Sequence, residues 1–354
     1  MNPFASALLH WFDRAGRKHL PWQGRDAYRV WISEIMLQQT QVTTVIPYYE
    51  RFMQRFPDVG ALANAPLDEV LHLWTGLGYY ARARHLHRAA QQLMQQHQGI
   101  MPRTLDAVQS LPGIGRSTAA AILAQAYELP HAILDGNVKR VLTRYFGIHG
   151  FPGNSSVESQ LWEHAQHCTP ATRVADYTQA IMDLGALVCT CKNPLCHTCP
   201  LAGTCIANAH GLQSQLPTPR PKRKRPQRVA HVAVISNHSN AVLLQQRPAA
   251  GLWGGLWVCP QFDDEASCKA FVQSIVMSNA SIRNLPVIHH AFTHFDLQLH
   301  PWWAADATPR EVVADTAGYC WYDPLHPARI GLAKPVLDIL KCLNRAQAPL
   351  ENAV

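Results

Sequence analysis

Residues 111–119 read LPGIGRSTA, a short stretch in which a proline and two glycines come before a run that favours a helix. Apolar residues at steps of three and four continue this helix over Ser117–Ala126. A tight turn of this kind places the backbone N–H groups of Gly113 and Gly115 at the start of a helix, where they can hold a phosphate without a charged side chain. The stretch therefore predicts either a phosphate-binding hairpin or a plain connection between two helices.

The sequence on both sides of this hairpin has a helical pattern. Apolar residues recur at three- and four-residue steps through Tyr28–Val45, Leu67–Leu77 and Ala81–Met94, and glycines and prolines separate these segments. Alternation typical of strands is nearly absent. Residues 1–212 are therefore predicted to form an all-helical domain.

The composition changes abruptly at residues 213–228, QSQLPTPRPKRKRPQR. This stretch holds four prolines and six basic residues without an acid, so it carries most of the net charge of +7. Pro-rich, self-repelling sequence predicts an extended linker, which is either a solvated tether or a binding element. A moderately basic chain favours a polyanionic partner, although net charge alone is a weak indication.

Beyond the linker, residues 229–354 have the pattern of an α+β domain. Alternating apolar runs predict strands, and turn-prone residues 236–240 predict a hairpin between the first two. The predicted strands are Val229–Ile235, Ala241–Gln246, Gly255–Pro260 and Ala291–Leu299, and the predicted helices are Glu265–Val276 and Pro335–Asn344.

Four cysteines lie close together near the end of the helical domain, with six, two and five residues between them. The N-terminus has the pattern of an amphipathic helix rather than a signal peptide, and no apolar run approaches the roughly 18 residues that span a bilayer. We therefore expect a cytoplasmic protein without membrane association, in which clustered thiols indicate a metal. Only one pair has C-x-x-C spacing, which favours iron–sulfur over zinc without deciding between them. The predicted ligands are Cys189, Cys196, Cys199 and Cys205, and Cys191 lies where it could compete with Cys189.

Two carboxyl groups stand out in the helical domain. Asp135 ends an apolar run and precedes a predicted helix, so it is either a helix cap or a catalytic carboxylate kept ionised by the helix start, and the two roles are compatible. Glu34 lies in the apolar segment VWISEIML, where burial would keep it protonated, unless it faces solvent. One neutral acid beside one ionised carboxylate is a general arrangement for cleaving glycosidic bonds.

Together these segments resemble the helix-hairpin-helix DNA glycosylases that carry an iron–sulfur cluster, and within them the adenine DNA glycosylase (MutY) family. The resemblance implies base excision repair, in which the enzyme acts as a monomer on double-stranded DNA and hydrolyses the N-glycosidic bond of adenine paired with 8-oxoguanine or guanine. It also implies one 4Fe-4S cluster on the four cysteines. The matching segments are residues 31–41, 73–84, 111–119, 133–140, 182–189 and 251–255.

The resemblance also implies roles for individual residues. Glu34 would protonate the adenine, Asp135 would stabilise the cationic sugar, Asn137 would orient the site, and Gln179 would lie near the base. Ser117 stands where related enzymes that also cut the strand carry a lysine, and a serine cannot form a Schiff base, so the chain resembles the monofunctional members.

Recognition of the base pair falls on other residues in this resemblance. Gln39 and Thr40 would lie beside the 8-oxoguanine, and Tyr79 would enter the base stack, whereas without the resemblance Tyr79 and Tyr80 would be taken for a buried aromatic pair. The residues expected at the DNA backbone are Gly113, Gly115 and Lys139.

The second domain resembles a Nudix fold without the glutamate-rich helix of active hydrolases, since Glu265–Val276 contains one glutamate. We therefore expect recognition of the damaged guanine without pyrophosphatase activity. Family members read the lesion with a Phe-Ser-His loop, which corresponds here to Phe292, Thr293 and His294. The threonine departs from that pattern and puts discrimination of 8-oxoguanine from guanine in doubt.

Two other functions compete with this interpretation. One is an endonuclease III type glycosylase and lyase that acts on oxidised pyrimidines, against which Ser117 and the second domain argue. The other is a structural DNA-binding protein that uses its cluster as a redox sensor.

Overall fold

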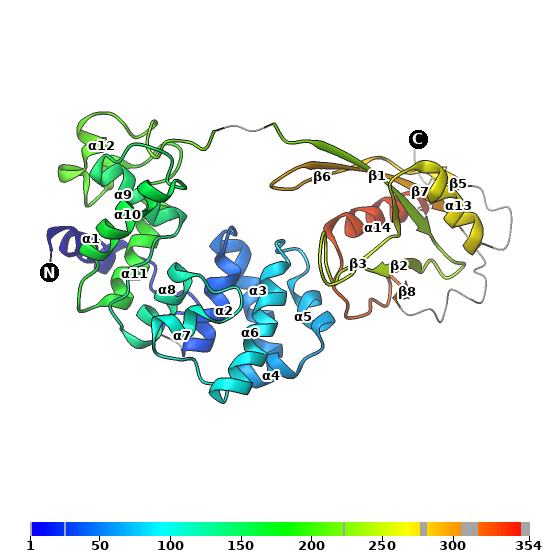
Figure 1. Cartoon of the computed structure of the whole chain (residues 1–354), viewed down its shortest axis with the longest axis horizontal. Coiled ribbons are helices and arrows are strands. Elements are labelled where there is room, and N and C mark those ends of the chain that lie inside the picture. The colour runs from blue at the N-terminus through cyan, green and yellow to red at the C-terminus, as the bar shows by residue number, and fades with distance from the viewer. Residues whose placement is uncertain (1, 25, 222–223, 277–281, 306–317, 348–354) are drawn as a thin grey trace, which may run out of the picture. The chain divides into compact units, whose positions relative to one another are not determined.

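The computed structural model describes residues 2–24, 26–221, 224–276, 282–305 and 318–347. Contacts along the chain divide it into two units (Figure 1). The first consists of Met1–Asn64 and His85–Lys222, and the second of Ala65–Arg84 and Arg223–Val354. Across the described part of the chain, no helix is both long and apolar enough to cross a lipid bilayer.

Helices build the first unit, which confirms the all-helical prediction for its described residues. Polar residues begin several of them. The side chain of Asn2 accepts the N–H of Ala5, and that of Asp26 accepts the N–H of Arg29, which satisfies donors that a helix start leaves unpaired. The elements are α1 (Pro3–Ala15), α2 (Ala27–Leu37), α3 (Val42–Arg55), α4 (Val59–Asn64), most of α6 (Ala81–His97), α7 (Leu105–Gln109), α8 (Arg116–Tyr127), α9 (Gly136–Phe146), α10 (Ser155–Cys168), α11 (Val174–Asp183), the short helices η1 (Leu184–Val188), η2 (Cys196–Thr198) and η3 (Ala202–Thr204), and α12 (Ile206–Ala209).

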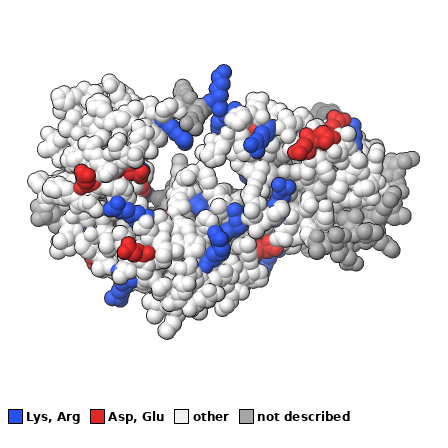
Figure 2. All heavy atoms as spheres, in the orientation of Figure 1, with Lys and Arg blue, Asp and Glu red and all other residues white. Residues whose placement is uncertain are grey.

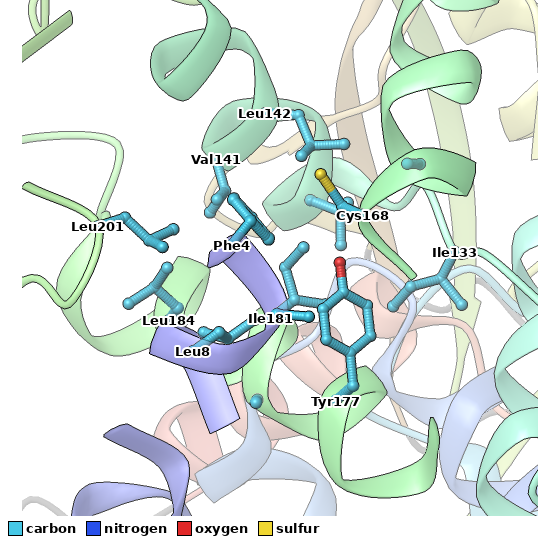
Figure 3. Close-up of a cluster of buried hydrophobic side chains, with 14 of the residues drawn as sticks. Phe4, Leu8, Ile133, Val141, Leu142, Cys168, Tyr177, Ile181, Leu184 and Leu201 are labelled. Atoms are coloured by element: carbon cyan, nitrogen blue, oxygen red, sulfur yellow. The ribbon is translucent and has the colours of Figure 1, made fainter. Parts of the chain in front are cut away.

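One apolar core of this unit joins α1, α9 and α11 (Figure 3). Phe4, Val141 and Ile181 come from these three helices and are almost fully buried. The same core includes Leu201, and the partly buried Cys199 packs against it. The segment that carries the four cysteines is therefore anchored to the core on which α9 rests.

The first unit departs from the sequence-based helices at one place that matters for the site. A single helix was predicted over Tyr28–Val45, but α2 ends at Leu37 and α3 begins at Val42. Gln39 lies between them with a φ of +57°, in the left-handed region, which stops the helix. The break places Gln39 and Thr40 in a loop.

The second unit contains two sheets, which confirms the α+β prediction for its described residues. In the larger sheet the order is β4-β1-β7-β5, with β6 also paired to β7, and the smaller sheet has the order β3-β2-β8. Strands β1 and β7 run parallel, with Ala230 opposite Leu299. The elements are α5 (Leu67–Trp74), β1 (Gln227–Ile235), β2 (Val242–Gln246), β3 (Trp257–Val258), β4 (Gln261–Phe262), α13 (Glu265–Ile275), β5 (Ile282–Asn284), β6 (Ile288–Ala291), β7 (Asp296–Ala304), β8 (Tyr319–Tyr322) and α14 (Lys334–Gln347).

Two strand predictions need correction. The turn expected at residues 236–240 is present, since the N–H of Asn237 donates to the carbonyl of Ala241 at 3.0 Å and Ser236 forms an antiparallel bridge with Val242, but β1 and β2 belong to different sheets. The strand predicted over Ala291–Leu299 is two strands, β6 and β7, joined by a tight turn. The N–H of Phe292 closes that turn by donating to the carbonyl of Phe295 at 2.8 Å.

The segment Ala65–Arg84, which the sequence pattern placed in the helical domain, groups with the second unit. The hydroxyl of Tyr80 donates to the carbonyl of Leu332 at 2.9 Å. A Cβ atom on Gly331 would lie 2.4 Å from the Cβ of Leu71, so only glycine permits this close approach. Helix α5 is therefore held by residues more than two hundred positions later, a relation that helical periodicity does not reveal.

Candidate active site

The hairpin predicted at residues 111–119 joins α7 to α8. Gly113 has a φ of +79°, and a Cβ atom there would lie 2.6 Å from the Cβ of His85, so both the backbone and the space require glycine. Gly115 caps α8 with a φ of −86°, and a Cβ atom there would meet nothing within 4 Å. The first N–H groups of α8 have no partners within the helix, which suits them to an anion.

We expect Gly113→Ala to destabilise the fold by about 2–4 kcal/mol, because strain at positive φ adds to the collision with His85. Gly115→Ala is the matched control and should cost less than about 1 kcal/mol, since its backbone suits any residue. Denaturant unfolding of both variants measures the difference. Equal losses would contradict this account of the turn.

Ser117 lies on the first turn of α8, and its hydroxyl accepts the N–H of Leu134 at 2.9 Å. This bond links the hairpin to the residue that immediately precedes Asp135. Beside it, the amide of Gln38 donates to the hydroxyl of Thr118 at 3.3 Å, which links the hairpin to the end of α2. The hairpin, α2 and the start of α9 thus belong to one hydrogen-bonded arrangement.

Asp135 is the N-cap of α9, as its position in the sequence predicted. Its Oδ1 accepts the N–H of Val138 at 2.7 Å. Burial raises the pKa of Asp135, against the opposing effects of the N–H groups of Val138 and Asn137 and the charge of Arg140. The net direction is opposite to that expected of a helix cap alone, because the carboxyl lies inside the protein.

Glu34 lies on α2, which packs against α8. Burial raises the pKa of Glu34 to about 7, and the charge of Asp135 acts in the same direction. The side-chain amide of Gln125, on α8, donates to Oε1 of Glu34 at 2.8 Å and opposes the rise. Glu34 is partly buried, so the structure favours the desolvated acid over the solvent-facing glutamate, and it brings the two expected catalytic carboxyl groups within electrostatic reach of each other.

Sequence reasoning missed Arg140, a residue of α9 that connects Asn137 to the cysteine-rich segment. Arg140 donates through Nη2 to Oδ1 of Asn137 at 2.8 Å and to the carbonyl of Gly185 at 2.7 Å, and through Nε to the carbonyl of Cys189 at 2.7 Å. Gly185 admits no side chain, since its Cβ atom would lie 2.6 Å from the Cβ of Asn137. In the sequence, the basic character of α9 was the only indication of this role.

A cavity of about 30 Å³ lies between α9 and the cysteine-rich segment. Arg144, only 3% exposed, borders it and donates to Sγ of Cys189 at 3.4 Å. Cys191 is exposed and does not line the cavity. Within the described ranges, no three or more His, Cys, Asp or Glu side chains are grouped so as to hold a metal ion. The cysteines that surround the cavity are Cys189, Cys196, Cys199 and Cys205.

Gln179 is buried on α11, and its position there is set by hydrogen bonds. Its amide donates to Oδ1 of Asp183 at 2.7 Å. Asp183 has no exposed surface and is paired with Arg17, whose Nε lies 2.8 Å from the same oxygen.

Three of the residues expected to contact DNA differ in their exposure and in their interactions. Gln39 is exposed in the α2–α3 loop. Tyr79, in the second unit, is 51% exposed with a φ of +49°, whereas Tyr80 is buried, so the two are not a buried pair. An exposed aromatic side chain on a strained backbone indicates a functional constraint. Lys139 is engaged in an ion pair, with its Nζ 2.6 Å from Oε1 of Glu158.

The turn between β6 and β7 presents the expected lesion-reading residues. Thr293 and His294 are exposed at its tip. Phe292 is partly buried, with its ring 4.7 Å from that of Phe295 and 5.5 Å from that of Trp253. These aromatic contacts give the turn a fixed base.

The end of the basic stretch contacts the same turn. Arg225 donates to the carbonyl of Phe292 at 3.4 Å, and the guanidinium of Arg228, already in β1, lies 4.4 Å from the ring centre of Phe295. The last residues of the predicted linker are therefore ordered against the β6–β7 turn. On the face drawn in Figure 2, basic and acidic side chains are interspersed over a mostly uncharged surface.

The hairpin, the two partly buried carboxyl groups and the cysteine-lined cavity define a helix-hairpin-helix DNA glycosylase. The model of the HhH-GPD superfamily base excision DNA repair proteins matches residues 32–167, and that of the NUDIX domain matches residues 231–342. A thermostable thymine-DNA glycosylase of known structure is similar, with a TM-score of 0.53 and 28% sequence identity over 58% of this chain and 95% of its own.

Proteins of similar sequence identify the family within this class of glycosylases. Adenine DNA glycosylase from Buchnera aphidicola subsp. Baizongia pistaciae is 38% identical over 97% of each chain. The human adenine DNA glycosylase is 34% identical over 94% of this chain and 73% of its own. The chain belongs to the adenine DNA glycosylase family, and it is a hydrolase of N-glycosyl compounds that acts on DNA in base excision repair.

Proposed function

We propose that this glycosylase hydrolyses the bond between adenine and its sugar when the adenine is paired with 8-oxoguanine or guanine, and that it leaves the strand intact. The observation that carries the chemistry is the pair of Glu34 and Asp135. The pKa of Glu34 is raised to about 7, so a substantial fraction of this acid is protonated at neutral pH, where an ordinary glutamate is almost fully ionised. The family membership supports adenine as the base.

The reaction requires the adenine to leave the base stack, because its glycosidic bond cannot be reached inside the duplex. Glu34 then gives its proton to N7 of the adenine, and the bond between N9 and C1′ breaks with its electron pair going to the base. Asp135 stabilises the positive charge that develops on the sugar. Water adds to C1′ and gives its proton to the Glu34 carboxylate, which completes hydrolysis and restores the acid.

Ser117 supports a monofunctional enzyme. A strand-cutting relative needs an amine to attack C1′, and a hydroxyl cannot form the required Schiff base. In the structure the hydroxyl of Ser117 instead accepts the N–H of Leu134. Its proposed role is to support the backbone next to Asp135.

The cysteine-lined cavity supports one 4Fe-4S cluster. Four cysteine thiols surround a single space, and four cysteine thiolates are the usual ligands of such a cluster. The cluster, when bound, would supply a covalent crosslink of residues 189–205. The hydrogen bonds of Arg144 to Sγ of Cys189 and to the carbonyl of Thr190 at 2.7 Å hold the first ligand in place.

We assign recognition of the orphaned guanine to the α2–α3 loop and to the β6–β7 turn. Gln39, Thr40 and Tyr79 would contact the base pair, and Gly113, Gly115 and Lys139 the DNA backbone, for which Lys139 would have to exchange its ion pair with Glu158 for a phosphate. The exposed side chains of Thr293 and His294 would read the lesion.

The test uses duplexes that place adenine opposite 8-oxoguanine, guanine or thymine. We expect adenine release from the first two, with strand breaks only after alkali treatment. Breaks without alkali would favour a lyase of the endonuclease III type. Failure to release any base would refute the proposal.

His294→Ala in the full-length chain tests the recognition role. We expect the preference for 8-oxoguanine over guanine to fall about 10-fold, since one lost contact to the lesion is worth roughly 1–2 kcal/mol. His326→Ala is the matched control, because His326 is an exposed histidine of the same unit outside the β6–β7 turn. An unchanged preference in His294→Ala would remove the turn from lesion reading. Deletion of residues 229–354 is a poorer test, because Leu71 and Tyr80 would lose their partners.

A further inference from the structure

Gln125 is a polar residue in the otherwise apolar run AAAILAQA of α8. Its side chain points to α2, where Nε2 donates to Oε1 of Glu34 at 2.8 Å. Ninety-one positions separate the two residues in the chain. Among the described residues, Oε2 of Glu34 has no hydrogen bond, so the two oxygens of this carboxyl group are not equivalent.

We infer that Gln125 is a positioning residue for the general acid, which occupies Oε1 of Glu34 and leaves Oε2 to carry the proton that is transferred to the adenine. The inference rests on the proposed role of Glu34. An N–H donor facing Oε1 disfavours a proton on that oxygen, because an acidic O–H and an amide N–H would then point at each other. The proton therefore resides on the oxygen without a partner.

The same bond helps the reaction beyond orientation. When the proton leaves, Glu34 becomes a carboxylate in a buried site, a state that burial disfavours. Among the described residues, Asp135 at the start of α9 is the titrating group whose charge acts on Glu34, and it also disfavours ionisation. From α8, the uncharged amide of Gln125 supplies the opposing stabilisation, and it does so most strongly as the negative charge develops.

Loss of the hydrogen bond from Gln125 should shift the pH dependence of adenine release in one direction. Glu34 is active as an acid while protonated, so the rate of adenine release is highest at low pH and falls as the pH rises through the pKa of Glu34. Removing an N–H that stabilises the carboxylate raises this pKa. The midpoint of the decline must then move to higher pH.

Gln125→Met removes the amide and nearly preserves the volume. We expect the single-turnover rate of adenine release at low pH to fall about 10-fold and the midpoint to rise by about 0.5–1 pH unit, with unchanged affinity for the duplex. Gln125→Glu has the same shape and adds a negative charge, so its midpoint should move further in the same direction even if Gln125→Met folds poorly. Gln92→Met is the control, because Gln92 donates to Gln96 on the exposed side of α6.

The double variant with Glu34→Gln separates the possible outcomes. If Gln125 acts through Glu34, adding Gln125→Met to Glu34→Gln changes the rate no further. An unchanged midpoint in both single variants would overturn the inference alone. A midpoint that moves to lower pH in Gln125→Met would show that the amide accepts from the neutral acid, which also overturns it. Near-normal release by Glu34→Gln itself would instead refute the proposed role of Glu34.

Discussion

Glu34→Gln and Asp135→Asn are each expected to lower single-turnover adenine release by about 10²–10⁴-fold while duplex binding stays near normal. A glutamine has no acidic proton to give to N7 of the base. An asparagine can still cap α9 through its side-chain oxygen, but it carries no charge to oppose the developing cation. Both substitutions preserve shape, so the loss is chemical.

A third substitution serves as the control for these variants. Asp264→Asn changes the N-cap of α13, whose carboxylate accepts the N–H of Ser267 at 2.7 Å, in the same geometry as Asp135 on α9. It should leave adenine release unchanged. Release measured with enzyme in excess over duplex isolates the chemical step. A near-normal rate in either active-site variant would refute the assignment of that residue.

The pH dependence of adenine release by the unmodified enzyme follows from the raised pKa of Glu34. The pKa of Glu34 is raised to about 7, so the protonated, active form predominates below that pH. Above it, the rate should fall by about 10-fold per pH unit, because each unit removes that factor of protonated acid. A flat profile through neutrality would mean that another group gives the proton.

Cys199→Ala is expected to abolish iron binding, whereas Cys191→Ala should retain it. Cys199 lines the cavity and packs against the core that also supports α9. Cys191 is exposed and does not line the cavity, and its carbonyl, which accepts from Arg144 at 3.2 Å, survives the substitution. Loss of a ligand should therefore disorder the cysteine-rich segment and weaken DNA binding, while loss of the neighbouring thiol should not.

Iron content per chain and absorbance in the visible range measure this difference. The unmodified protein should be brown and hold about four irons per chain, as a cubic cluster requires. A colourless protein that binds one zinc would overturn the iron–sulfur assignment. Equal iron loss in both variants would mean that Cys191 takes part in ligation.

Local patterns were sufficient to predict much of this molecule. Helical periodicity located α5, α6 and α8, because a helix depends mainly on neighbours three and four positions away. Asp135 was identifiable as a cap for the same reason, since its partner Val138 lies within one turn. The spacing of the four cysteines indicated one shared site, and the structure places all four around one cavity.

Contacts between distant segments could not be read in the same way. The break of the long helix at Gln39 and the division of Ala291–Leu299 into two strands depend on single turns within apolar runs. The position of α5 depends on Gly331, and the environment of Glu34 depends on Gln125 and Asp135. Periodicity left open whether Glu34 is buried. It indicates the side of a helix on which a residue lies, but not which other helix packs against that side. Burial and hydrogen-bond partners are properties of the packed chain, and they convert an ordinary glutamate of α2 into an acid suited to neutral pH.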